Sequence, residues 1–102
     1  MMGYEMKALE QILGCYFHQD WVDEFESDEV ALRAIIDSEP IEQIRAGVME
    51  IDELLASNLS EDQLKTVLMN KFGCYFDPGA IGATYENWLK KLRNDFTRGL
   101  QD

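Results

Sequence analysis

The sequence has few basic residues and no long apolar run, and both shortages exclude classes of function. Nine Lys and Arg stand against twenty Asp and Glu among 102 residues, which gives a net charge of −11. A chain this acidic repels nucleic-acid phosphates and anionic lipid surfaces, so we expect no direct nucleic-acid or membrane binding. The longest stretch free of Asp, Glu, Lys and Arg, residues 11–19, is far shorter than the roughly 20 apolar residues of a membrane-spanning helix. The first residues lack the basic start and apolar run of a signal peptide, so we expect a cytoplasmic protein.

Cysteine and histidine are also scarce, which limits the chemistry available. The two cysteines, Cys15 and Cys74, and the single His18 do not supply the clustered ligands of a zinc site. On a helix Cys15 and His18 would share a face, and Asp20 would complete a possible catalytic set. Cys15 lies between apolar residues, however, and a buried cysteine is usually inert. We therefore expect a packed cysteine and no enzyme activity. A thiol enzyme that uses Cys15 or Cys74 is a less favoured alternative.

One acidic pattern resembles the start of a calcium-binding loop and then fails. Glu24, Glu26 and Asp28 alternate as the first three ligands of such a loop do. The loop also requires Gly at its sixth position and an acidic residue at its twelfth, where this chain has Glu29 and Ile35. No glycine-rich phosphate loop is present either. We expect no metal and no cofactor.

Apolar periodicity predicts an all-α fold. Leu, Ile, Val and Phe total 27 residues, enough for one core, so we expect a single domain over residues 1–102. Apolar residues recur at steps of three and four in five segments, which predicts helices at about 4–17, 29–37, 40–57, 61–72 and 85–97. The predicted caps are Ser27 or Asp28, Ser38, Ser60 with Gln63, and Thr84 at the starts, and Asn58, Gly73 and Gly99 at the ends. Residues 18–26 form a loop or a short helical turn in this interpretation, and Val22 and residues 72–75 leave room for a small β element. The prediction is a small single-domain helical bundle of about five helices.

One short motif occurs twice. Residues 14–17 read Gly-Cys-Tyr-Phe, and residues 73–76 read the same. The flanking residues do not match, whereas structural repeats share a pattern over 20 residues or more. We interpret the recurrence as coincidence.

The acidic residues are concentrated in the first two-thirds of the chain. Residues 1–64 hold 3 basic and 16 acidic residues, and residues 65–102 hold 6 and 4. Such a surface either keeps a small domain soluble or docks a basic partner, and we favour the second interpretation. The predicted partner contacts are Asp20, Asp23, Glu24, Glu26, Asp28 and Glu29, with Glu50 and Glu53 as a second patch. Trp21 and Phe25 lie within the first stretch, where aromatic residues often anchor interfaces, although we expect Trp21 in the core.

Residues 16–21 read Tyr-Phe-His-Gln-Asp-Trp, and this segment resembles the immunity proteins of bacterial contact-dependent growth inhibition systems (CdiI-type proteins). The resemblance continues at residues 50–55 and 85–89. It implies a non-enzymatic cytoplasmic protein that binds the C-terminal domain of a cognate toxin, often by covering its active site. Many such toxins are nucleases with basic substrate-binding surfaces, which the acidic stretch here would suit.

The resemblance leaves some points open. Its motif does not mark contact residues, and we favour structural roles for Tyr16, Asp20 and Trp21. We expect a monomer. The alternative function is an acidic helical adaptor or regulatory domain that docks a basic protein partner.

Overall fold

The computed structural model describes residues 6–101, which form helices and connecting segments without a strand. The helices are α1 (Lys7–Tyr16), α2 (Trp21–Glu24), α3 (Asp28–Ser38), α4 (Ile41–Ala56), α5 (Glu61–Thr66) and α6 (Tyr85–Gln101). A π-helical segment, η1 (Val67–Lys71), continues α5, and a short 3-10 segment, η2 (Pro78–Ile81), precedes α6. The predicted all-α fold is therefore confirmed, and the predicted turn at residues 18–26 contains α2.

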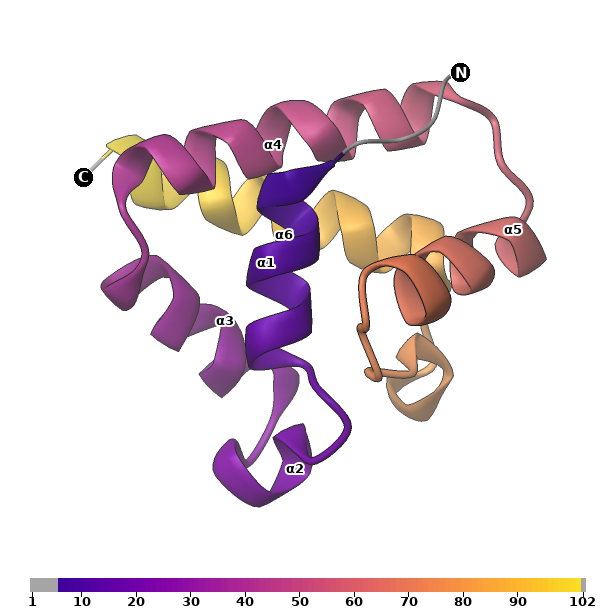
Figure 1. The fold of residues 1–102 in the computed structure, drawn as a ribbon, viewed down its shortest axis with the longest axis horizontal. Helices are drawn as coiled ribbons and strands as arrows, with labels where there is room; N and C mark the ends of the chain where they lie inside the picture. The colour runs from indigo at the N-terminus through magenta and orange to yellow at the C-terminus, as the bar shows by residue number, and fades with distance from the viewer. Residues whose placement is uncertain (1–5, 102) are drawn as a thin grey trace.

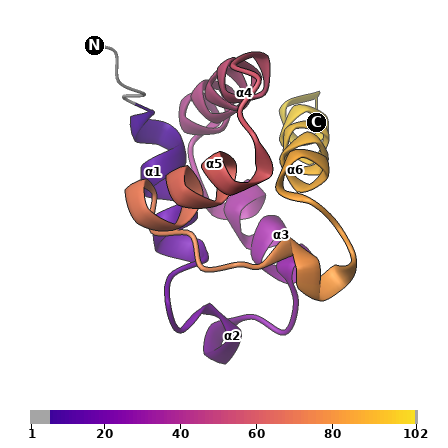
Figure 2. The ribbon, with the colours of Figure 1, turned by 90° about the vertical axis from the view of Figure 1, so that its right-hand side faces the viewer.

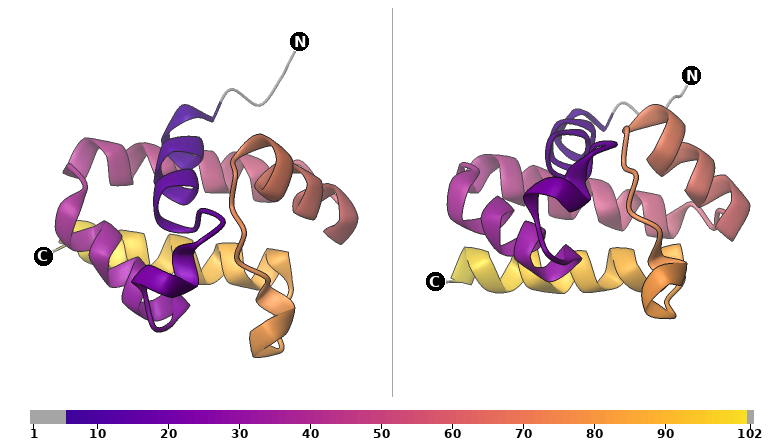
Figure 3. Two further views of the ribbon diagram at one scale, coloured as in Figure 1. Left: turned by 60° about the horizontal axis from the view of Figure 1, so that its bottom comes forward. Right: turned by 90° about the horizontal axis from the view of Figure 1, so that it is seen from below.

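Helices α4 and α6 run alongside each other, and α1 crosses them (Figures 1 and 2). Helix α3 packs against α1 and α6, and α5 packs against the start of α6. Helix α2 lies at the end of the molecule away from α4 (Figure 1). In the left view of Figure 3, α2 and the loop around η2 both lie below α6, at separate places along it.

The apolar faces of these helices meet in one core. Fully buried side chains come from every long helix, including Leu9, Ile12 and Leu13 of α1, Ile35 of α3, Ile51 and Leu54 of α4, and Trp88, Leu89, Leu92 and Phe96 of α6. Burial of such side chains from water is the main force that holds amphipathic helices together. The three- and four-residue spacing seen in the sequence thus corresponds to the core faces.

Three predicted caps are confirmed at the starts of helices. The Ser27 hydroxyl accepts a hydrogen bond from the Val30 N–H, and Ser60 with Gln63 forms a capping box. Thr84 Oγ1 accepts from the Asn87 N–H at the start of α6. Each satisfies backbone donors that the helix itself leaves free.

Two predicted boundaries are wrong. Ser38 does not cap α4; it is the last residue of α3, and Pro40 holds the cap position of α4. The reason is that the residue before a proline is pushed into extended backbone; Glu39 is extended, so α3 ends at Ser38. Gly99 does not end α6, which runs to Gln101. A Cβ at Gly99 would lie 2.9 Å from Ile36 Cγ2, so this glycine permits close packing of α6 on α3.

The two Gly-Cys-Tyr-Phe segments, interpreted as a coincidence, lie against each other in the structure. Gly73 follows η1 with φ +72° and lies beside Gly14, whose Cα is 3.8 Å from the position of a Gly73 Cβ. The Tyr75 N–H donates a 2.7 Å hydrogen bond to the Phe17 carbonyl, and the Phe17 and Phe76 rings lie 5.7 Å apart. The shared glycine allows the close approach, and the shared phenylalanine fills the core beneath it.

The two cysteines have different surroundings. Cys74 is buried, as a packed cysteine would be, but Cys15 is exposed. The prediction of a packed Cys15 is therefore wrong. It follows Lys7 and Gln11 at four-residue steps, and all three lie on the outer face of α1.

Candidate partner-binding surface

The acidic segment 20–26 forms an exposed corner of the molecule that comprises α2 and the residues on either side of it. Asp20, Asp23, Glu24 and Glu26 are exposed, and with Val22 we call them the acidic corner. Val22 is 64% exposed, so an apolar side chain lies among the carboxylates. An exposed apolar residue with a charged rim is typical of protein interfaces.

Aromatic contacts attach the acidic corner to the core. The Trp21 ring lies 5.3 Å from the Phe17 ring and 5.6 Å from the Phe76 ring. Trp21 is half-buried and packs against the core, so the side chain that the sequence placed in the core lies at its edge. Phe25 stacks on Tyr16 at 6.2 Å. The Tyr16 hydroxyl donates a 2.9 Å hydrogen bond to the Glu39 carboxylate. Burial is the main cause that raises the pKa of Tyr16, and the Glu39 carboxylate raises it further.

Asp28 lies inside the protein rather than on the acidic corner. It is 6% exposed, and its carboxylate accepts a 3.4 Å hydrogen bond from Trp88 Nε1. Lys91 Nζ lies 3.6 Å from the same oxygen. Asp28 precedes Leu32 and Ile35 at helical spacing on the buried face of α3, a signal that was present in the sequence. Its carboxylate joins α3 to α6.

Glu29 is exposed and paired with a base. Lys91 Nζ donates to Glu29 Oε2 at 3.0 Å, and this hydrogen bond lowers the pKa of Glu29. Partial burial opposes the charge on Lys91, but the hydrogen bond to Glu29 and the charges around it outweigh this effect, so the pKa of Lys91 is raised. Glu29 therefore carries less uncompensated charge than its neighbours.

The second predicted patch lies away from the first. The Glu50 carboxylate accepts hydrogen bonds from the N–H groups of Ala8 and Leu9, at the N-terminal end of α1. Helix α2 follows the other end of α1, and ten helical residues span about 15 Å. Glu53, on the same helix as Glu50, is exposed. The structure therefore does not join Glu50 and Glu53 to the acidic corner.

Ion pairs neutralise the bases of α6 but not the acidic corner. Each basic side chain of α6 has a carboxylate partner: Lys90 with Glu86, Lys91 with Glu29, Arg93 with Asp52, and Arg98 with Asp95. Within residues 6–101, Asp20, Asp23 and Glu26 make no ion pair, and Glu24 Oε2 lies 3.1 Å from Nε2 of the His18 imidazole. The uncompensated negative charge predicted from the sequence is thus present at this corner.

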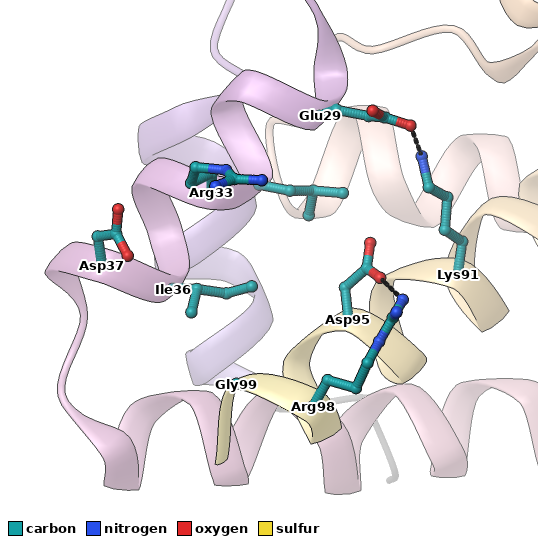
Figure 4. A pocket seen from close by; sticks show the side chains of 9 residues that line it. Glu29, Arg33, Ile36, Asp37, Lys91, Asp95, Arg98 and Gly99 are labelled. Atoms are coloured by element: carbon teal, nitrogen blue, oxygen red, sulfur yellow. Dashed lines mark hydrogen bonds and ion pairs between the residues drawn. The ribbon is translucent and has the colours of Figure 1, made fainter. Parts of the chain in front are cut away.

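A groove of about 480 Å³ lies between α3 and α6 (Figure 4). Its sides alternate in charge: α3 contributes Glu29, Arg33 and Asp37, and α6 contributes Lys91, Asp95 and Arg98. Leu32, Ile36 and Gly99 complete its lining. Because acids and bases are equal in number, the groove favours neither a cationic nor an anionic ligand.

The described residues show little sign of a reaction centre. Burial raises the pKa of Cys74 to about 12, so this thiol stays protonated at neutral pH. No group of three or more His, Cys, Asp or Glu side chains within residues 6–101 could hold a metal ion. None of the helices described combines the length and hydropathy needed to cross a bilayer.

The fold and the charged surface define a small, acidic, all-α domain with an exposed corner suited to protein contact. A sequence model of the CdiI immunity protein family matches residues 5–96, so the chain belongs to that family. Its fold is similar to that of a chain in the crystal structure of a CdiA-CT/CdiI complex from Y. kristensenii 33638. That match has a TM-score of 0.82 and 32% identity, and covers 89% of this chain and 97% of the other. A comparison with curated proteins found no significant match.

Proposed function

We propose that this protein is a cytoplasmic immunity protein that binds the C-terminal domain of a cognate toxin and neutralises it without catalysis. The observation that carries the proposal is the family match over residues 5–96. It is supported by the similarity to a chain crystallised in a CdiA-CT/CdiI complex, which covers nearly all of that chain.

The acidic corner is the proposed contact surface. Asp20, Asp23 and Glu26 are exposed and uncompensated, and Val22 between them offers an apolar anchor. Glu24 and Glu29 contribute from the same side, each with a partner of its own. Asp28 and Glu50 already bind groups within the fold, so in this proposal they support the structure and do not contact the toxin. Glu53 lies outside the primary surface.

The charge of this corner favours a toxin with a basic surface. A nuclease binds phosphates through such a surface, and clustered carboxylates can occupy it in their place. We propose that the toxin is a nuclease and that the acidic corner covers its active site. Long-range attraction between the two surfaces would also speed association.

The proposal is tested by mixing the purified protein with the toxin domain encoded next to it and measuring affinity by calorimetry at several salt concentrations. We expect a 1:1 complex and loss of toxin activity. A triple variant, Asp20→Asn with Asp23→Asn and Glu26→Gln, should bind at least about tenfold more weakly at low salt. The matched control, Glu42→Gln with Glu53→Gln and Asp62→Asn, removes three exposed charges elsewhere and should bind like the wild type.

Each part of the proposal can fail separately. Absence of binding by the wild type at micromolar concentrations would overturn the immunity function. Equal weakening by both triple variants would place the interface elsewhere. If the wild type binds the toxin fully but toxin activity is undiminished, the proposal that the acidic corner covers the active site is wrong.

A further inference from the structure

Helix α2, which carries the centre of the acidic corner, has little support of its own. It is only four residues long, none of its residues is buried, and the residue before it provides no side-chain cap. Helices this short are not stable in isolation because nucleation costs more than a few hydrogen bonds return. Something outside α2 must therefore hold its conformation.

The His18 side chain contacts both ends of α2. Its Nδ1 accepts a 3.1 Å hydrogen bond from the backbone N–H of Asp20, the residue that precedes the helix. Its Nε2 lies 3.1 Å from Oε2 of Glu24, the last residue of the helix. Because Nδ1 acts as an acceptor, the ring proton lies on Nε2, next to Glu24. One imidazole thus bridges the start and the end of the helix.

The backbone and Trp21 complete this arrangement. The Trp21 N–H donates to the His18 carbonyl at 2.9 Å, and the Phe25 N–H donates to the Trp21 carbonyl at 2.9 Å. Trp21 attaches α2 to the core through Phe17 and Phe76. Trp21 therefore fixes the position of α2 against the core, and the imidazole ring of His18 holds the two ends of α2 in place.

We propose that His18 is a positioning residue that holds α2 in the conformation that binds the partner. This inference rests on the proposed function. If Asp20, Val22 and Asp23 are already held in one geometry in the free protein, the entropy cost of ordering them on binding is smaller. If the binding conformation is populated for only a fraction of the time, the apparent affinity falls by that fraction. His18 acts through α2 and need not touch the toxin.

The test uses three variants of the full chain that leave the formal net charge unchanged. His18→Ala removes both contacts, His18→Asn offers an amide oxygen near the position of Nδ1, and His18→Gln offers an amide nitrogen near that of Nε2. Gln19→Ala is the control, because Gln19 is the exposed neighbour of His18. We expect His18→Ala to bind the toxin domain about tenfold more weakly, Asn and Gln to recover part of this loss, and the control to bind like the wild type.

Two further measurements separate positioning from charge and from general stability. In the free protein, the amide hydrogens of Asp23 and Phe25 should exchange faster in His18→Ala, while the melting temperature stays within about 2 °C of the wild type. The salt dependence of the association rate should remain that of the wild type, because every carboxylate is retained.

Several outcomes would overturn the inference. They are wild-type affinity in His18→Ala, or Asn and Gln variants that bind no better than Ala. If the wild type itself does not bind, the proposed function fails. The exchange measurement then still decides the role of His18: unchanged exchange in His18→Ala contradicts it, and faster exchange in α2 alone supports it.

Discussion

The carboxylate of Glu50 accepts a 2.8 Å hydrogen bond from the backbone N–H of Leu9 and so caps helix α1 from a different helix. Met6, at the cap position of α1, provides no side-chain hydrogen bond, so Glu50 performs this role across 41 residues of sequence. Glu61 does the same for α6, where it accepts from the N–H groups of Tyr85 and Glu86. Negative charge at the start of a helix also complements its dipole. Part of the acidity of this chain therefore stabilises its fold.

Replacement of Glu50 by alanine is expected to destabilise the protein. The N–H groups of Ala8 and Leu9 would lose their acceptor, and loss of a helix cap costs about 1 kcal/mol in the free energy of unfolding. Urea denaturation followed by circular dichroism measures this change. Glu53→Ala, an exposed acid three residues further along α4, is the control and should stay within about 0.5 kcal/mol of the wild type.

Asp28→Ala is expected to cost more. The change leaves the Trp88 indole N–H without its acceptor inside the core and removes one of the two carboxylates within 4 Å of Lys91 Nζ. Loss of a buried hydrogen bond to a charged group costs about 2 kcal/mol. Asp23→Ala removes the same functional group from the exposed side of α2 and should leave stability nearly unchanged. Equal stability of the two variants would contradict the buried role of Asp28.

The sequence is sufficient to predict the helices because their apolar spacing and local caps lie within single segments. It is not sufficient to predict the roles of Asp28 and Glu50, because their partners, Trp88 and Leu9, lie 60 and 41 residues away. The helical spacing of Asp28 to Leu32 and Ile35 does place it on the buried face of α3. Its acidic neighbours in the sequence, however, favour the interpretation that it is exposed. The contact of Gly14 with residues 72–73 depends in the same way on tertiary packing.

Two glycines in helices should respond in opposite directions to substitution by alanine. A Cβ at Gly14 would lie 2.7 Å from the Phe72 carbonyl oxygen, so the backbone must move, and we expect a loss of about 2 kcal/mol. A Cβ at Gly47 would lie 3.5 Å from its nearest neighbours in Ile12 and Phe96, an ordinary contact. Gly47→Ala should therefore gain about 0.5–1 kcal/mol from its better helix propensity. Thermal unfolding of the two variants checks both signs, and stabilisation by Gly14→Ala would contradict the close approach.

The thiols should differ in reactivity. Cys15 is exposed and Cys74 is buried, so a thiol reagent at neutral pH should label one cysteine quickly in the folded protein. The second should react only when the protein unfolds. Cys15→Ser should abolish the fast phase, and a fast phase that persists in this variant would contradict the burial of Cys74.

Alkaline pH should weaken the fold through Cys74. Burial raises the pKa of this thiol from 9.0 to about 12 in the folded state. Below pH 9 the thiol is protonated whether the chain is folded or not, so its contribution to stability is complete. Between pH 9 and 12 the unfolded chain releases the proton while the folded chain retains it, so stability falls as pH rises. The change corresponds to about 4 kcal/mol over the whole interval.

Urea unfolding between pH 7 and 11, with a reductant present, measures this loss, and Cys74→Ala isolates its origin. The variant starts less stable, because a buried sulfur is removed, but its stability should decline less steeply above pH 9. A decline above about pH 10 should remain in both proteins, because the pKa values of Tyr16 and Tyr85 are also raised, first by burial and then by nearby carboxylates. Identical slopes between pH 9 and 10 would show that Cys74 does not control the loss of stability at alkaline pH, since both proteins retain the two tyrosines.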